Sequence, residues 1–497
     1  MAFTRENVYE LGGDWAPGIL WYARGVAAMK AKALAEPTSW RFYGAMHGVD
    51  TKLWHKLGYL PTGDKKPSSK LQKAFWKQCQ HGSWYFLPWH RGYLIAFEAN
   101  VRAEVVKLGG PADWTLPYWN YFKPHQSALP PAFASADWPD GQGNNPLFVT
   151  QRYGPNSDGN VFVPVSQVNL KALTIPQFTG VSSGGSPGFG GVDTGFSHGG
   201  SVHGGIETQP HDWVHGLVGG GDPNNPQIPG LMSDPDTAGL DPIFWLHHAN
   251  IDRLWEVWRR NPPSHVNPTD PNWVKGPGNV GERIFEMPMP DGSTWKYTPG
   301  DMVDLGNLGY GYDDYAAGGA AIAAPVQGIA GVAAVETGKH VELVGASQGA
   351  VPIQGGDVSA SVHLDKAVRQ KVTQGIAAAA AAPDRVFLNL ENVTGTSDAT
   401  AFHVYVGLPD GAKPEDHPEL QAGSIALFGV RKASLVDEEH GGQGLTFVLD
   451  ITDIANALHL TNKLDVDALH VRFVPVTPVP KEANVKIGRV SVFRQGS

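Results

Sequence analysis

Histidine residues gather in two clusters that lie more than a hundred residues apart in the chain. Each cluster offers three imidazoles: His47, His81 and His90 in the first, and His211, His215 and His248 in the second. Imidazole nitrogens bind copper, zinc, iron and nickel, so these ligands alone do not select the metal. Two all-histidine groups indicate a paired-metal centre, because a structural zinc site usually contains cysteine.

The spacing within the second cluster indicates that helices hold it. His211 and His215 are four residues apart, which would place both rings on one face of a helix, where they could bind one ion. His247 and His248 are adjacent and would point about 100° apart on a helix, so only one of them can face the metal. We favour His248, because Asp252 follows it by one turn and could orient its ring.

Apolar periodicity predicts helices that position both clusters, over residues 38–48, 68–80, 91–108 and 243–260. Pro88 lies just before His90 and predicts a turn over residues 86–89 rather than the interior of a helix. Glu98 follows His90 by two turns. We expect its carboxylate to accept a hydrogen bond from a ligand imidazole.

The composition changes along the chain and predicts two domains. Residues 1–315 carry the helical patterns and both histidine clusters, and residues 316–335 read as a flexible Ala/Gly linker. Residues 336–497 contain short β-branched runs separated by Gly, Pro and Asp, which is typical of an antiparallel sandwich. The predicted strands cover residues 385–390, 401–406, 445–450, 469–474 and 485–493. The fold class is therefore a mainly α domain with long loops, followed by an all-β sandwich.

The charge balance excludes some classes of partner. A net charge of −10 over 497 residues argues against nucleic acid, because phosphate binding needs a basic face. The uncharged residues 316–335 are mostly Ala and Gly, whereas a membrane span needs larger apolar side chains. We see no signal peptide and expect a cytoplasmic protein. The single cysteine, Cys79, excludes internal disulfides and fits a reducing compartment.

Two motifs resemble the copper signatures of the tyrosinase and polyphenol oxidase family. They are H-x4-F-L-P-W-H-R-x2-L-x3-E over residues 81–98 and D-P-x-F-W-x2-H-x3-D over residues 241–252. Tyr310-Gly311-Tyr312 also resembles the Y-x-Y motif that closes the catalytic domain in plant and fungal members. The resemblance covers residues 1–315. It implies a four-helix bundle around a type-3 copper pair, which uses O2 to hydroxylate monophenols and to oxidise o-diphenols to o-quinones.

The resemblance also implies which residues bind the two copper ions of each chain. One ion would be held by His47, His81 and His90, and the other by His211, His215 and His248. Cys79 lies two residues before His81, an arrangement that forms a Cys–His thioether in similar fungal and molluscan proteins. We expect the same bond here, which would lock the His81 ring.

Four further residues bear on the reaction that the resemblance implies. Glu207 matches the family position that holds a water over the site, and it could act as or support the base that takes the phenol proton. Asp212 stands where many monophenol-hydroxylating members have Asn. It keeps an acceptor but adds a charge. Gly216 and Pro235 are small and should leave the entrance open. These features favour a tyrosinase over a catechol oxidase that acts on o-diphenols only.

The β-rich end is similar, more loosely, to the C-terminal domain of plant-type polyphenol oxidases. In relatives such a domain can cover the copper site, so we expect residues 336–497 to form a lid. The sequence does not show which side chain would fill the site.

Two other classes of protein compete with the oxidase interpretation. A haemocyanin-like O2 carrier would use the same copper site, but this chain has one unit and no repeats. A dinuclear hydrolase would need a bridging carboxylate, which neither cluster supplies in register. The expected partners are O2, small phenols and a possible second copy of the chain.

Overall fold

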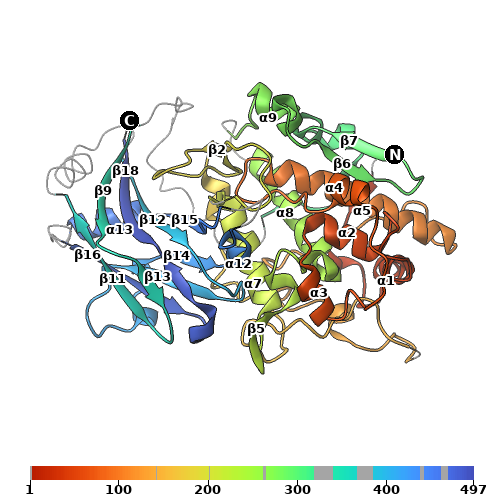
Figure 1. Ribbon diagram of the computed structural model, residues 1–497, viewed down its shortest axis with the longest axis horizontal. Helices are drawn as coiled ribbons and strands as arrows, with labels where there is room; N and C mark the ends of the chain where they lie inside the picture. Colours follow the sequence, from red (N-terminus) through yellow and green to blue (C-terminus); the bar gives the residue numbers. More distant parts are fainter. Residues whose placement is uncertain are drawn as a thin grey trace.

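The computed structural model describes residues 3–141, 143–200, 202–260, 265–317, 340–365, 384–436, 441–460 and 468–496. Helices and long loops form one part of the molecule and a large antiparallel sheet forms the other, and the two parts lie side by side (Figure 1). Each part has its own buried apolar cluster. The predicted Ala/Gly linker covers residues 316–335, and all of it except residues 316 and 317 lies outside the described residues.

The helices described in the first part are α1 (Pro17–Lys30), α2 (Trp40–His47), α3 (Thr51–Lys56), α4 (Ser69–Phe75), α5 (Phe86–Lys107), α6 (Pro131–Ala134), α7 (Trp213–Gly219), α8 (Pro242–Arg260), α9 (Pro271–Lys275) and α10 (Leu305–Leu308). Of these, α2, α4, α5 and α8 overlap the four ranges predicted from periodicity, and α7 carries His215 of the predicted helical pair. Helices α1, α3, α6, α9 and α10 were not predicted. Short strands join the loops: β1 (Phe3–Arg5), β2 (Thr179–Gly180), β3 (Gly191–Val192), β4 (Gly221–Asp222), β5 (Asn225–Pro229), β6 (Phe285–Pro288), β7 (Thr294–Tyr297) and β8 (Tyr310–Tyr312).

Helix α5 begins earlier than the sequence predicted. It starts at Phe86, so Pro88 lies in its first turn and the turn predicted for residues 86–89 is wrong. Proline is tolerated in a first turn because the backbone N–H groups there have no partner within the helix. As a result, α5 presents His90 from a helical backbone whose preceding turn supplies carbonyl acceptors.

Aromatic packing holds α5 and α8 together beneath the histidines. The rings of Phe97 and Trp245 stack with centroids 3.4 Å apart, and Tyr93 lies 4.7 Å from Trp245. All three side chains are fully buried. Such rings bury large apolar areas and pack in few arrangements, so the helices that carry His90 and His248 are held in a fixed relation.

A wide turn precedes α7. Residues Glu207–Asp212 form a π-type turn in which Gln209 has an extended backbone, and the Gln209–Pro210 peptide is cis. His211 therefore lies just before α7 and His215 lies within it. Their ring centroids are still 4.5 Å apart, so the four-residue spacing brings the rings together as predicted.

The C-terminal part forms one large eight-stranded antiparallel sheet, with a small two-stranded sheet of β10 (Val351–Ile353) and β17 (Val485–Ile487), rather than the sandwich of two sheets that the sequence predicted. The strands of the large sheet lie in the order β14 (Gln421–Ala426), β13 (Ala401–Val406), β16 (Ala468–Pro475), β11 (Val358–Leu364), β9 (Val341–Ser347), β18 (Arg489–Gln495), β12 (Arg385–Val393) and β15 (Leu445–Asp450). At its two ends, Leu449 of β15 packs against Gly423 of β14, so the sheet curls almost into a barrel. One curled sheet can enclose its own apolar core, so no second large sheet has to cover its inner face.

Predicted and observed strands overlap where hydrophobic alternation is strong. Strands β12, β13, β15 and β16 cover the runs predicted at residues 385–390, 401–406, 445–450 and 469–474, and β17 and β18 share the run predicted at residues 485–493. Strands β9, β10, β11 and β14 were not predicted. Among its described residues, this part also contains the helices α12 (Val430–Ala433) and α13 (Thr452–Leu460).

A buried ionic network joins the N-terminus to the end of the first part. Asp252 accepts hydrogen bonds from Arg91 Nε at 2.5 Å, Tyr310 Oη at 2.7 Å and Tyr312 Oη at 2.5 Å. Burial alone would raise the pKa of Asp252, but Arg91 and Arg5 hold it below its ordinary value. The expectation that Asp252 orients a ligand ring is therefore wrong.

Glu98 belongs to the same network. Its carboxylate pairs with Arg5 Nη2 at 2.7 Å and with Arg102. It thus does not accept from a ligand imidazole, contrary to the prediction. Both carboxylates face cations, because a buried charge is far more costly without a partner of opposite sign.

Replacing Asp252 with asparagine should destabilise the protein by roughly 3 kcal/mol, because buried Arg91 and Arg5 would lose their shared counter-charge. The free energy of unfolding, measured with urea on the metal-free protein, checks this. Asp291→Asn is the control, since Asp291 is exposed in the turn between β6 and β7. Equal stabilities of the two variants would contradict a structural role for the network.

Among the described residues, no helix combines the length and the apolar character needed to cross a membrane.

Candidate metal centre

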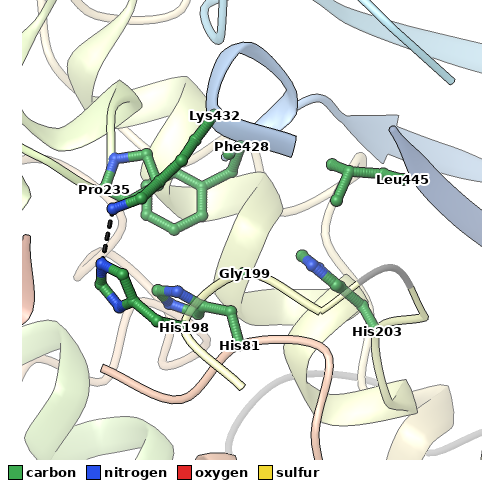
Figure 2. Close-up of a pocket in the computed structure, with 9 residues that line it drawn as sticks. His81, His198, Gly199, His203, Pro235, Phe428, Lys432 and Leu445 are labelled. Atoms are coloured by element: carbon green, nitrogen blue, oxygen red, sulfur yellow. Dashed lines mark hydrogen bonds between the residues drawn. The ribbon is translucent and has the colours of Figure 1, made fainter. Parts of the chain in front are cut away.

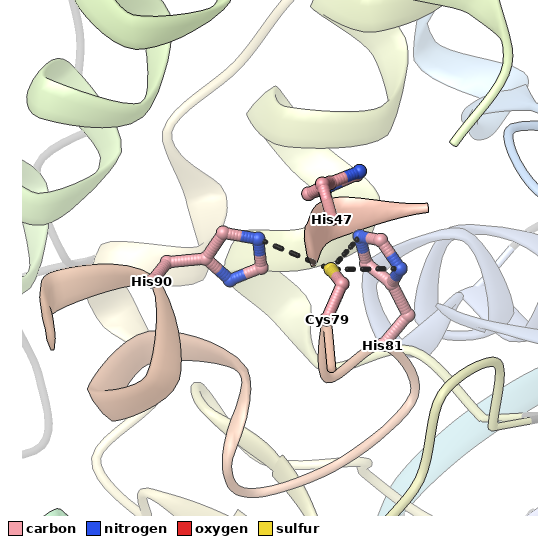
Figure 3. Close-up of side chains that lie close together, drawn as sticks. All are labelled: His47, Cys79, His81 and His90. Carbon is pink, nitrogen blue, oxygen red and sulfur yellow. Dashed lines mark hydrogen bonds between the residues drawn. The ribbon is translucent and has the colours of Figure 1, made fainter. Parts of the chain in front are cut away.

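Three of the predicted ligands meet in one buried group. His47 comes from the end of α2, His90 from α5, and His81 from the loop before α5 (Figure 3). Their ring centroids are 5.2–5.7 Å apart. Cys79 lies among them, and its sulfur is 3.4 Å from both ring nitrogens of His81 and from Nε2 of His90.

The second group brings together four histidines from α7, α8 and the turn before α7. They are His211, His215, His247 and His248, and at least one ring nitrogen of each lies within 4.8 Å of the others. The two groups adjoin, because the rings of His90 and His248 stack with centroids 4.4 Å apart. The structure thus places every predicted ligand in one of two neighbouring groups.

Backbone carbonyls orient three of the rings. Nδ1 of His47 donates to Pro235 O at 2.8 Å, Nδ1 of His90 to Phe86 O at 2.8 Å, and Nδ1 of His215 to Met232 O at 2.7 Å. In a neutral imidazole, a proton on Nδ1 leaves a lone pair on Nε2. Each of these rings therefore directs an Nε2 acceptor away from its carbonyl. A fixed tautomer of this kind is typical of metal-binding histidines.

The unpaired ring nitrogens test whether the site fits metal ions. Nε2 of His47 and Nε2 of His211 are buried with no hydrogen-bond partner among the described residues. Nε2 of His215 lies 3.2 Å from Nε2 of His248. Buried acceptors without donors are costly, whereas a cation among them would satisfy several at once. The donor set therefore fits two metal ions bound through nitrogen.

Burial keeps these rings neutral. It lowers the pKa of His47 to about 4, and with neighbouring histidines it lowers the pKa values of His81, His90 and His211 well below the ordinary range. A neutral ring can donate its lone pair to a metal at neutral pH without first losing a proton.

His247 and His248 occupy different positions in the second group. The His248 ring contacts His90 and His47 of the first group, with centroids 4.4 and 6.2 Å apart. The His247 ring instead lies beside Tyr121, whose hydroxyl is 3.4 Å from Nδ1 of His247. His248 therefore lies between the two groups and His247 lies at their edge.

Glu207 is a buried carboxylate close to the first group. Both of its oxygens accept from the backbone N–H of Gly82, at 2.9 and 3.1 Å, next to His81. Burial and the neighbouring charge of Asp212 raise the pKa of Glu207 to about 8. A raised pKa makes this carboxylate a stronger proton acceptor once it is ionised.

Asp212 uses both of its oxygens on histidines. Oδ1 accepts from Nδ1 of His211 at 2.9 Å, and Oδ2 accepts from Nδ1 of His203 at 2.7 Å. Asp212 therefore orients a predicted ligand. His203 was missed at the sequence level because it lies on a Gly-rich loop without helical spacing. Its place four residues before Glu207 was the only available signal.

Phe428 of the β-rich part lies directly over the histidines. Its ring stacks on His215 with centroids 4.2 Å apart, and it meets His81 and His211 edge-on at 5.5 and 5.6 Å. The space that remains beside it is a cavity of about 10 Å³, lined by His81, Phe428 and residues of both parts (Figure 2). Small-molecule pockets start at roughly 300 Å³, so this arrangement leaves no room for a substrate.

The two residues predicted to keep the entrance open both lie under the β-rich part. A Cβ added to Gly216 would be 3.2 Å from Cβ of Ala426. Ala426 lies two residues before Phe428 in the chain. Pro235 lines the cavity beside Phe428, and its Cγ would be 3.5 Å from a Cβ on Gly429. Both small residues therefore make room for the segment that carries Phe428.

Ion pairs hold this segment against the helical part. Arg431 contacts Asp234 at 2.8 Å and Asp50 at 3.0 Å, and Lys432 contacts Asp236 at 2.8 Å. Lys432 Nζ also donates to Nε2 of His198 at 2.6 Å, as Figure 2 shows. Burial alone would raise the pKa of Asp236, but Lys432 and Arg431 hold it well below its usual range.

Comparison with known proteins identifies related sequences for both parts of the chain. The family model "common central domain of tyrosinase" matches residues 37–175 and 184–261. A second model, described only as a domain of unknown function, matches residues 340–495. The β-rich part thus has relatives of its own.

Several named proteins are similar to this chain. Tyrosinase HcTyr1 of Hahella sp. (strain CCB-MM4) is 33% identical over an alignment of 511 positions that covers 99% of both chains. A chloroplastic polyphenol oxidase of Malus domestica is 27% identical over 59% of this chain and 46% of its own length. A latent apple tyrosinase has a similar structure, with a TM-score of 0.58 at 21% identity, covering 99% of this chain and 97% of that one.

Proposed function

Because this chain belongs to the tyrosinase family, we propose that it hydroxylates monophenols and oxidises o-diphenols to o-quinones. As in other members of the family, it is a copper-dependent oxidoreductase with two copper ions. The observation that carries the proposal is the pair of adjoining histidine groups whose Nε2 lone pairs face a common space. The bacterial relative named as a tyrosinase over its whole length supports the same activity.

We assign the copper ligands from the geometry of the two groups. His47, His81 and His90 would hold one ion, and His211, His215 and His248 the other. The copper pair, when bound, supplies O2 activation and electron transfer from the phenol. The protein holds six neutral nitrogens in place by hydrogen bonds from Nδ1 and by burial. Because neutral ligands do not cancel the positive charge of the copper ions, that charge would attract a phenolate.

Glu207 would accept the phenol proton, directly or through a water. Its carboxylate is fixed by Gly82 N–H beside His81, and its raised pKa suits a base. Asp212 is less suited to this step, because both of its oxygens already accept from histidines. Glu207 thus has the proton-transfer role and Asp212 the role of orienting His211.

A catechol oxidase restricted to o-diphenols is the alternative. It uses the same copper pair but does not need a base for a monophenol. A buried carboxylate with a raised pKa next to the histidines favours the tyrosinase. The small residues Gly216 and Pro235 also favour it, since they would admit a phenol ring once Phe428 moves away.

Oxygen uptake by the copper-loaded full chain tests the proposal. We would supply 4-methylphenol and, separately, 4-methylcatechol, before and after cleavage at a protease site introduced between residues 318 and 339. Turnover of both substrates is expected after cleavage. Turnover of the catechol alone would make the enzyme a catechol oxidase, and uptake with neither substrate would overturn the proposal. The variant Glu207→Gln should lose mainly the monophenol reaction.

The β-rich part would act as a lid that keeps the enzyme latent. Phe428 occupies the space over His215, the remaining cavity holds no phenol, and Arg431 and Lys432 pair with three aspartates of the helical part. A substrate can reach the metals only when this segment moves. The latent apple tyrosinase of similar fold supports this interpretation.

A thioether between Cys79 and a ring carbon of His81 is expected once copper and O2 are present. The sulfur lies 3.4 Å from both ring nitrogens of His81, so the two side chains are already in contact. The bond replaces one S–H and one C–H, and O2 takes up the two electrons and two protons. Intact mass after copper loading in air should fall by two hydrogen atoms. Cys79→Ser should show no such loss, and an unchanged wild-type mass would disprove the bond.

A further inference from the structure

His203 lies beside the second histidine group but is not one of the assigned ligands. Its Nδ1 donates to Oδ2 of Asp212 at 2.7 Å, while the other oxygen of Asp212 accepts from His211 Nδ1 at 2.9 Å. One carboxylate therefore joins two imidazoles, and only His211 is in the ligand group. The His203 side chain is 3% exposed.

The loop that carries His203 is held tightly in place. A Cβ on the next residue, Gly204, would lie 2.5 Å from the backbone nitrogen of Gly191, so only glycine fits there. Gly205 N–H donates to Gly188 O at 2.8 Å just beyond. His203 is thus presented to Asp212 from a fixed backbone, which is what an orienting side chain requires.

The charges around His203 support a specific role. Nδ1 of His203 is 2.7 Å from Asp212 and 3.8 Å from Glu207, two buried carboxylates of like charge. In the described part of the chain, no lysine or arginine forms an ion pair with either carboxylate. The Nδ1–H of His203 therefore lies between the two carboxylates.

We propose that His203 is a positioning residue of the second copper site: it fixes the Asp212 carboxylate so that Asp212 keeps His211 Nε2 directed at the metal. A carboxylate has no N–H with which to anchor itself. Without His203, Asp212 would be free to rotate away from His211 and would remain a buried charge facing Glu207. This inference deepens the proposed function and rests on it for the identity of the metal.

A double-mutant cycle tests this role in the full chain. His203→Leu removes the donor, and His203→Asn keeps an N–H at a similar position. Copper per chain and the affinity for the more weakly held ion would be measured by competition with a copper chelator. His203→Leu should weaken that affinity by roughly 10–100-fold, the usual effect of losing an outer partner of a ligand. His203→Asn should recover most of it.

The decisive variant is His203→Leu combined with Asp212→Asn. An amide at position 212 carries no charge and can still accept from His211, so adding His203→Leu to Asp212→Asn should change the affinity by less than about threefold. Equal losses in both backgrounds would overturn the proposal and leave His203 with a packing role. The unfolding temperature of each metal-free variant is measured as well, to show that the variant is folded under the conditions of the copper titration. If the wild-type protein binds two copper ions but oxidises no phenol, the proposed function is refuted. The copper affinities of the variants would still decide the role of His203.

Discussion

Replacing His248 with alanine is expected to leave the protein with about one copper ion per chain and to lower phenol oxidation by roughly a thousandfold or more. His248 lies between the two groups, with its ring stacked on His90 at 4.4 Å and its Nε2 3.2 Å from that of His215. Its loss would remove one of the three nitrogen ligands of the second copper ion. It would also remove the ring that stacks on His90 of the first group. Both ions must act together on O2, so activity should fall far more than copper content.

The neighbouring histidine is the matched control. His247→Ala removes an equally buried imidazole one position away on α8, but one that lies beside Tyr121 at the edge of the group. It should keep two copper ions and most of its activity. Copper analysis and oxygen uptake on both variants would be compared. If His247→Ala loses the copper and His248→Ala retains it, the assignment of the third ligand is reversed.

Replacing Phe428 with alanine is expected to activate the full chain by at least about tenfold in kcat/KM for a phenol. Truncating a buried Phe costs about 3–5 kcal/mol, and this cost falls on the closed arrangement alone, because an open segment has no packing to lose. Each 1.4 kcal/mol is about tenfold in an equilibrium. The smaller side chain also frees space over His215. Oxygen uptake at low substrate concentration, without protease, measures the effect.

Three further variants separate loss of the plug from general damage. Phe428→Leu keeps apolar bulk over the histidines and should stay largely latent. Val436→Ala changes an exposed side chain of the same segment and should have no effect. Arg431→Gln should activate through a different contact, because it removes the pairs with Asp50 and Asp234. If Phe428→Ala is no more active than wild type and cleavage still activates, Phe428 is not the plug. If cleavage also fails to activate, the β-rich part is not a lid.

Residue types and their spacing were enough to predict the candidate ligands and most of the elements that carry them. The four-residue spacing of His211 and His215 and the motifs around His90 and His248 identified histidines that the structure brings into two adjoining groups. Helical periodicity located α5 and α8, and β-branched alternation located β12, β13, β15 and β16. These features are local, because they depend on the 3.6-residue or two-residue repeat of one element.

The surroundings of those histidines could not be predicted from the sequence, because they come from long-range packing. Helical spacing suggested Asp252 and Glu98 as acceptors for ligand rings, but both pair with arginines brought in from the N-terminus and from α5. The rings instead donate to carbonyls of Pro235, Phe86 and Met232, and backbone carbonyls have no sequence signature. The curled eight-stranded sheet could not be predicted either, because its closure depends on contacts between strands far apart in the chain.

Phe428 shows the same limit most clearly. It lies 180 residues beyond His248 in the numbering, in a segment with no motif, yet its ring packs on His215. His203 was likewise indistinguishable from a surface histidine until the fold placed it against Asp212. Residue type and spacing determine which chemistry the chain can support. Long-range packing determines which groups orient the histidines, which neutralise the buried carboxylates and which cover the site. These contacts join segments far apart in the sequence, and no periodic pattern predicts them.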